Sequence, residues 1–245
     1  ELLCLASVLT ANESFQVRKS AIALLKYFEK KSLGSESLER YTEAICSKSS
    51  VVYKKVLFDL SNDIQNIKPE SLYNRISYLT QNINLIFPAA REAILSLLVP
   101  MVSKVILNYE TPLPEKDSTT DIHEKAFDSS SLMVLSNLFE ITVNFGSSMS
   151  NQIEVLWISL SNNVQNIDKI VEFLLQSSLE LKNPSFVEQS RQIIDYLAFA
   201  RSDPAYIIDK LINNLQPRMM VPPQLGNKST APISKDYPYV CDIKK

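Results

Sequence analysis

Glycine is nearly missing from this sequence, because the 245 residues contain only Gly34, Gly146 and Gly226. Roughly 7% glycine is usual in globular proteins. Phosphate-binding loops, dinucleotide-binding turns and two-residue hairpins all need glycine for a positive φ or for close approach of the backbone. Three single, widely separated glycines therefore argue against nucleotide-binding α/β folds and against hairpin-rich β folds.

Reactive and metal-binding side chains are equally scarce. The chain has one histidine, His123, and three widely spaced cysteines, Cys4, Cys46 and Cys241. It contains no Cys-x-x-Cys or His-x-x-x-His pair, so a zinc site is not expected. The single histidine lies in a polar stretch, without the nucleophile and orienting partner that catalysis needs. We therefore predict a protein that is not an enzyme and has no catalytic residues, cofactor, metal ion or small-molecule substrate.

Net charge and long apolar runs are also lacking. The 25 basic and 27 acidic residues give a formal charge of −2, which does not predict binding to nucleic acid. The most apolar stretch, Ala93 to Leu107, contains Pro100 and Lys104 and is too short to cross a bilayer. The odd number of cysteines and the absence of a secretory leader favour a cytoplasmic protein without membrane insertion, and we expect a piece of a longer chain.

Helical periodicity fills residues 1–216. Apolar residues recur three and four positions apart over segments of about 10 to 20 residues. Four prolines begin such segments, where a missing N–H costs nothing: Pro69, Pro88, Pro184 and Pro204. Pro100 instead lies inside a segment and is expected to kink the helix or to split it at Val99.

Segments of this length would form one helical pair about every 40 residues, which is the period of HEAT and armadillo arrays. We therefore predict an all-α fold, a HEAT/armadillo-like α-α superhelix of stacked antiparallel helical hairpins, over residues 1–216. A closed helical bundle is the alternative. Residues 217–245 hold five of the twelve prolines and predict an extended tail, either packed on the body or disordered.

One polar segment, Tyr109 to Ser129, interrupts the helices. It contains Pro112 and Pro114 and has no apolar stripe, so it predicts a long loop. Three hydroxyl side chains in an acidic setting make this loop a candidate site of phosphorylation: Ser118, Thr119 and Thr120.

Trp157 is the single tryptophan of the chain. It shares a helical face with Ile153 and Leu160, which predicts a buried position with the indole N–H bonded to a carbonyl group. The alternative is an anchor at an interface with a partner.

Six stretches resemble, in the same order, the central region of the Furry family of cell-morphogenesis proteins, and a fungal member most of all. They are QVRKSAIALL at 16–25, LLVPMV at 97–102, VLSNLFEIT at 134–142, LWISL at 156–160, IIDYLA at 193–198 and the pair Pro222-Pro223. Met101 departs from the family pattern, which has tryptophan at that position.

The resemblance implies a very long HEAT-like scaffold that acts with NDR-class kinases and their Mob co-activators. Such a protein would bind protein partners in the cytoplasm, at sites of polarised growth and cell separation, through residues that the sequence does not identify. The helical pattern alone leaves two other functions open. One is a karyopherin- or adaptor-like transport module, and the other is a helical regulatory domain of an enzyme whose active site lies elsewhere.

Overall fold

The computed structural model describes residues 1–67, 69–85, 88–110, 127–181, 183–200 and 204–219. In these ranges the regular elements are helices, and the single β-type pairing is an antiparallel bridge between Tyr109 and Phe127. The all-α prediction is therefore confirmed. The chain divides into two compact units, Glu1–Leu197 and Ala198–Lys245, and the division falls within the eleventh α-helix.

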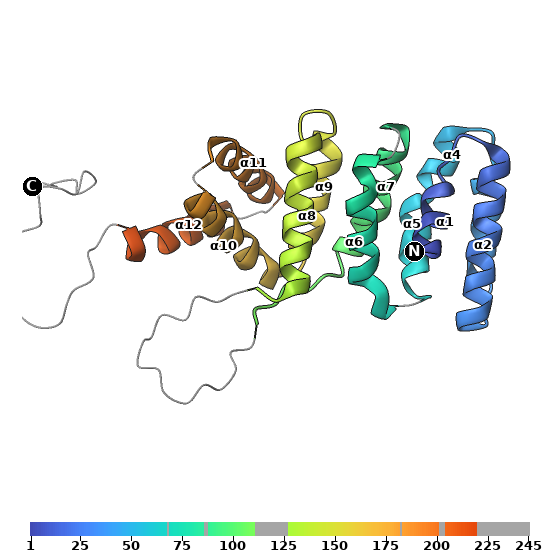
Figure 1. Cartoon of the computed structure of the whole chain (residues 1–245), viewed down its shortest axis with the longest axis horizontal. Coiled ribbons are helices and arrows are strands. Elements are labelled where there is room, and N and C mark those ends of the chain that lie inside the picture. Colours follow the sequence, from blue (N-terminus) through green and yellow to red (C-terminus); the bar gives the residue numbers. More distant parts are fainter. Residues whose placement is uncertain (68, 86–87, 111–126, 182, 201–203, 220–245) are drawn as a thin grey trace, which may run out of the picture. The chain divides into compact units, whose positions relative to one another are not determined.

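The first unit begins with α1 (Leu2–Leu9) and the long helix α2 (Phe15–Leu33) (Figure 1). A 3₁₀ turn, η1 (Ser37–Tyr41), then leads into three short helices, α3 (Thr42–Ile45), α4 (Ser50–Lys55) and α5 (Leu57–Gln65). Longer helices follow: α6 (Leu72–Asn82), α7 (Pro88–Val102), α8 (Ser129–Phe145), α9 (Ser150–Ser161), α10 (Val164–Leu181) and α11 (Pro184–Ala200).

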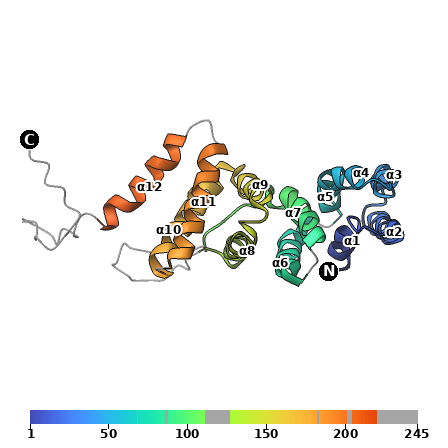
Figure 2. The same cartoon turned by 90° about the horizontal axis from the view of Figure 1, so that it is seen from above.

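Helices of the first unit pack in two rows. Figure 2 shows α1, α6 and α8 in one row and α5, α7 and α9 in the other, and neighbours within each row are in contact. The α4–α5 stretch runs in the same direction as α7, as two contacts in chain order show. Lys54 pairs with Glu92, and further along both segments the Ser61 hydroxyl donates to the carbonyl of Leu97. Consecutive helices α8 and α9 fold back on each other as a hairpin.

Local sequence signals set several helix ends. The prolines at 88, 184 and 204 are the first residues of α7, α11 and α12 (Pro204–Met219), and Pro69 begins the 3₁₀ turn η2 (Pro69–Ser71), as predicted. Gly34 ends α2 with φ at +67°, which a side chain rarely tolerates.

Pro100 does not split its helix at Val99, and the other predicted outcome, a kink at this residue, stays a prediction. Helix α7 is continuous through this residue to Val102. A proline removes one backbone hydrogen bond at a cost of about 3 kcal/mol. The neighbouring side chains of Leu97, Leu98 and Val102 are fully buried, and their burial offsets this cost.

The second unit contains α12, which continues to Met219. Its last turn includes Pro217, so the helix extends beyond residue 216, where the proline content predicted its end. A proline near a helix terminus disrupts only the bonds of the final turn. The remainder of the predicted tail lies outside the described residues.

Candidate interaction surfaces

Trp157 is part of the core, as predicted, and is completely buried. Its indole N–H donates to the hydroxyl oxygen of Thr142 on α8 at 2.9 Å, so the acceptor is a hydroxyl and not the expected carbonyl. The same hydroxyl donates to the carbonyl of Leu138 at 2.9 Å. The tryptophan therefore joins α9 to α8 and is not available as a surface anchor.

Arg18 is the most deeply buried cation of the described chain, with 1% of its surface exposed. Its guanidinium donates to four backbone carbonyls at 2.5 to 2.8 Å, those of Asn12, Glu13, Ile45 and Ser47. It also lies 4.0 Å from the ring centre of Tyr53. These contacts fasten α2 to the α3–α4 connection, so the arginine within the family-like stretch at 16–25 has a structural role.

Glu29 is a buried carboxylate with a comparable role. It accepts hydrogen bonds from the hydroxyl of Ser35, the amide and hydroxyl of Ser37 and the amide of Leu38, at 2.5 to 3.0 Å. Burial acts to raise the pKa of Glu29, but the bonds from Ser37, Leu38 and Ser35 together hold this pKa below its ordinary value. The carboxylate therefore stays ionised and fixes the start of η1 beside α2.

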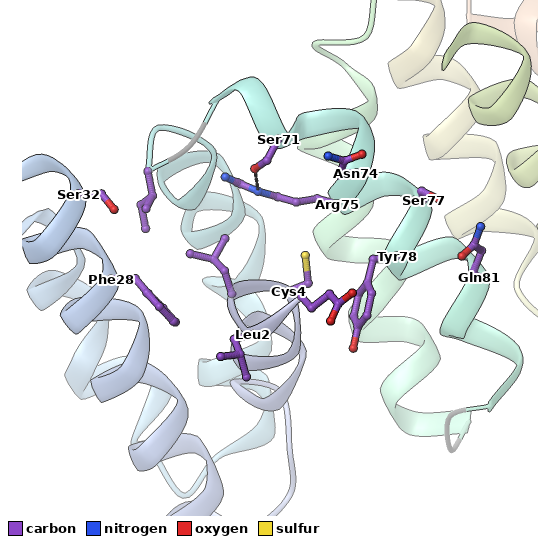
Figure 3. A pocket seen from close by; sticks show the side chains of 13 residues that line it. Leu2, Cys4, Phe28, Ser32, Ser71, Asn74, Arg75, Ser77, Tyr78 and Gln81 are labelled. Atoms are coloured by element: carbon purple, nitrogen blue, oxygen red, sulfur yellow. Dashed lines mark hydrogen bonds between the residues drawn. The ribbon is translucent and has the colours of Figure 1, made fainter. Parts of the chain in front are cut away.

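A pocket of about 760 Å³ lies between α1, α2 and α6 (Figure 3). Leu2 and Phe28 give it an apolar side, and α6 contributes polar side chains such as Asn74 and Gln81. Burial raises the pKa of the Cys4 thiol in its wall, which keeps the thiol protonated and a poor nucleophile. Arg75 in the opposite wall donates to the Ser71 hydroxyl at 2.8 Å and to the Ile64 carbonyl at 3.1 Å.

A second, more apolar hollow of about 360 Å³ lies where α5, α7 and α9 meet, and we call it the α5–α7–α9 groove. Leu95, Ser96 and Val99 of α7 form its floor. Phe58 of α5 and Val155 of α9 form the two sides and are 47% and 46% exposed. Lys54, Asn151 and Gln152 complete the lining.

The sequence pattern does not predict this groove. Phe58 and Val155 each lie outside the buried stripe of their helix, which for α5 is Leu57, Leu60 and Ile64. The only sign of the groove in the sequence was a large apolar residue outside the buried stripe of its helix. Phe58 and Val155 line one hollow only because packing brings α5 and α9 to the two sides of α7.

The ends of the predicted loop at 109–129 are fastened to α10. The Tyr109 hydroxyl donates to the Glu172 carboxylate at 2.6 Å, and Phe127 packs edge-on against Phe173 with 6.3 Å between ring centres. Burial and this carboxylate raise the pKa of Tyr109. Asn166 holds the preceding segment, since its side chain accepts from the Leu107 amide and donates to the Val105 carbonyl.

The candidate phosphorylation sites, Ser118, Thr119 and Thr120, and the single histidine, His123, lie outside the described residues. Among the residues that the structure does describe, no group of three or more His, Cys, Asp or Glu side chains is arranged to hold a metal ion. None of the helices in these ranges has both the length and the apolar character needed to cross a membrane.

Helices packed in two rows, with the buried Arg18 and Glu29 bonded to neighbouring backbone segments, define an all-α protein. Over 208 residues, 84% of this chain, the sequence is 34% identical to Cell morphogenesis protein PAG1 of Saccharomyces cerevisiae. Over 198 residues, 80% of the chain, it is 29% identical to Cell polarity protein mor2 of Schizosaccharomyces pombe. The chain therefore belongs to the Furry family of cell-morphogenesis and cell-polarity proteins, and the predicted family and its fungal character are confirmed.

The chain covers 8% of the length of each of these two relatives. No family model matches the sequence, and no solved structure matches it.

Proposed function

We propose that this chain is a non-enzymatic scaffold segment of a very large protein that acts in cell morphogenesis and polarity. The observation that carries the proposal is the 34% identity, over 84% of the chain, to a protein named for cell morphogenesis. The second relative is named for cell polarity. An extended array of helices offers long surfaces for protein partners, which suits a scaffold.

The proposed architecture is a HEAT/armadillo-like superhelix. Two rows of helices, with α1, α6 and α8 in one and α5, α7 and α9 in the other, support this architecture. So do the α8–α9 hairpin and the common direction of α4–α5 and α7. In such an array each helical pair contacts mainly its neighbours, and the surfaces of the rows remain free for binding.

The absence of catalysis is part of the proposal. The hydrogen bonds of the buried ionisable groups support this part of the proposal. Arg18 and Glu29 hold backbone segments together, and Arg75 bonds to the end of α5. An active site requires such groups to face a substrate instead.

The proposed partners are an NDR-class kinase and its Mob co-activator, in the cytoplasm at sites of polarised growth. The resemblance of the six ordered stretches to the Furry family supports this assignment. The segment would contribute a binding surface, and kinase activity would belong to the partner.

A segment exchange in budding yeast tests the proposal. The matching region of PAG1 is either deleted or replaced by this chain, and cell shape and co-precipitation of the NDR-class kinase and Mob are measured. We expect the replacement, but not the deletion, to keep normal shape and to retain both proteins. A replacement that behaves like the deletion refutes the morphogenesis role. Normal shape without retained kinase refutes the proposed partners, and recovery of a small GTPase or vesicle-coat protein in their place would favour a transport module.

A further inference from the structure

We propose that the pocket between α1, α2 and α6 binds an extended, uncharged peptide segment of a partner protein. The inference rests on the proposed function as a scaffold and names the kind of partner segment that this pocket takes. Its volume, about 760 Å³, lies within the range of about 300–1,000 Å³ that is usual for ligand sites. The proposal is carried by the hydrogen-bonding groups of α6 that line the pocket.

The polar side chains of α6 differ in whether they are bonded within the chain. Three that lie away from the pocket donate to backbone carbonyls: Tyr73, Thr80 and Asn82. Arg75 in the pocket wall also donates hydrogen bonds within the chain. Four other α6 side chains in the lining make no hydrogen bond to the described residues: Asn74, Ser77, Tyr78 and Gln81 (Figure 3). Polar groups that line one pocket and are not used by the fold are available to a ligand.

The two amide side chains suit the backbone of an extended peptide. An asparagine or glutamine side chain offers a donor and an acceptor together, which are the complements of a peptide C=O and N–H. An extended segment has these backbone groups free, whereas an α-helix uses them internally. Asn74 and Gln81 lie two turns apart on one side of α6, which is about 10 Å along the helix axis. Three residues of an extended chain span about 10 Å, so one segment can bond to both amides.

The rest of the lining favours a neutral segment with one large apolar side chain. Leu2 and Phe28 form the apolar side of the pocket, and Leu2 is 64% exposed. Among the described residues, the charged side chains of the lining are one acid, Glu1, and one base, Arg75, which is held by its bonds to neighbouring groups. The lining therefore has no excess charge that would select an acidic or a basic segment. A charged segment would lose hydration there without gaining a complementary charge.

Selection from a phage-displayed library of random peptides, with the whole chain as the target, tests the proposal. Each peptide has about eight residues, long enough in extended form to reach past both amides. We expect the enriched sequences to be uncharged and to share one large apolar residue. One of them is then synthesised in two forms, unmodified and N-methylated at the residues that flank the apolar one. Fluorescence anisotropy should show that N-methylation weakens binding at least about tenfold, because it removes backbone N–H groups and leaves every side chain in place.

Matched variants locate the binding site. Asn74→Ala and Gln81→Ala should each weaken the unmodified peptide about threefold, and about tenfold together, because each removes one side-chain amide. Asn144→Ala on α8 and Gln16→Ala on α2 change the same residue types at exposed positions outside the pocket, and should have no effect. Leu2→Ala should weaken binding about threefold, because it removes part of the apolar side. Circular dichroism melts should show all variants folded, since every changed residue is exposed.

Four results would overturn the proposal: no enrichment, enriched sequences rich in charged residues, equal binding of the N-methylated peptide, or equal effects of the pocket variants and their controls. Equal binding of the N-methylated peptide would assign the pocket to an apolar group and not to a peptide backbone. The yeast exchange separates the two proposals. If the unmodified replacement supports normal growth and no peptide is selected, only the pocket assignment is wrong. If a peptide binds and the replacement fails, the proposed function is wrong.

Discussion

Replacing Trp157 with alanine should destabilise the first unit strongly. The side chain has no exposed surface, and deleting a buried tryptophan costs roughly 3–5 kcal/mol. The lost hydrogen bond adds little, because the Thr142 hydroxyl keeps its bond to the Leu138 carbonyl after the indole is removed. A protein of ordinary stability has about 5–15 kcal/mol in total, so the loss is a large fraction of it.

The change in melting temperature follows from this free energy. At about 2–4 °C for each kcal/mol in a chain of this size, the midpoint should fall by roughly 6–20 °C. Far-UV circular dichroism during heating measures it. Val155→Ala is the control, because this residue is two positions away on α9 but is 46% exposed, and its midpoint should stay within about 2 °C of the unmodified chain.

If Trp157→Ala melted like the unmodified chain, the argument from the burial of this side chain would be refuted, and the alternative role of the tryptophan as a surface anchor would be favoured.

Three further changes test the structural assignments. Arg18→Lys should destabilise the chain by at least about 1.5–3 kcal/mol, because an ammonium group cannot reach the four carbonyls that the guanidinium joins. Urea unfolding measures this loss, and an unchanged midpoint would contradict the structural role of Arg18. Glu29→Gln should be destabilising near neutral pH but not in acid. The folded-state pKa of Glu29 is lowered from 4.5, so its stabilisation is complete above that value and is lost as the pH falls through the folded pKa; urea unfolding at several pH values measures the difference, and a pH-independent one would refute it. Gly34→Ala should cost about 1 kcal/mol, since φ is +67° although space is open around the residue, and a neutral result in thermal melts would show that the turn adjusts.

Signals confined to one turn of the chain were sufficient to place several helix starts and the core face of α9. A proline at a first helical position and a tryptophan in line with Ile153 and Leu160 depend on neighbours three or four residues away. The burial of Arg18 could not be predicted in this way, because two of its acceptors, Ile45 and Ser47, are more than 25 residues distant in sequence. Pro100 shows the reverse case, in which long-range packing overrides a local rule.

The α5–α7–α9 groove could not be predicted from the sequence for the same physical reason. Its walls come from α5 and α9, which are separated by almost a hundred residues and meet through α7. The ion pair between Lys54 and Glu92 beside it likewise depends on the alignment of α4 with α7.

The antiparallel bridge between Tyr109 and Phe127 gives the chain a natural insertion point. The two residues lie opposite each other, and both are held by contacts with α10 that do not depend on what joins them. Lengthening a connection whose ends are already adjacent is inexpensive, since each doubling costs only about 0.6 kcal/mol of loop-closure entropy. A fluorescent protein whose termini lie close together could therefore be placed between residues 110 and 127, to report the position of the parent protein in a living cell with both rows of helices intact.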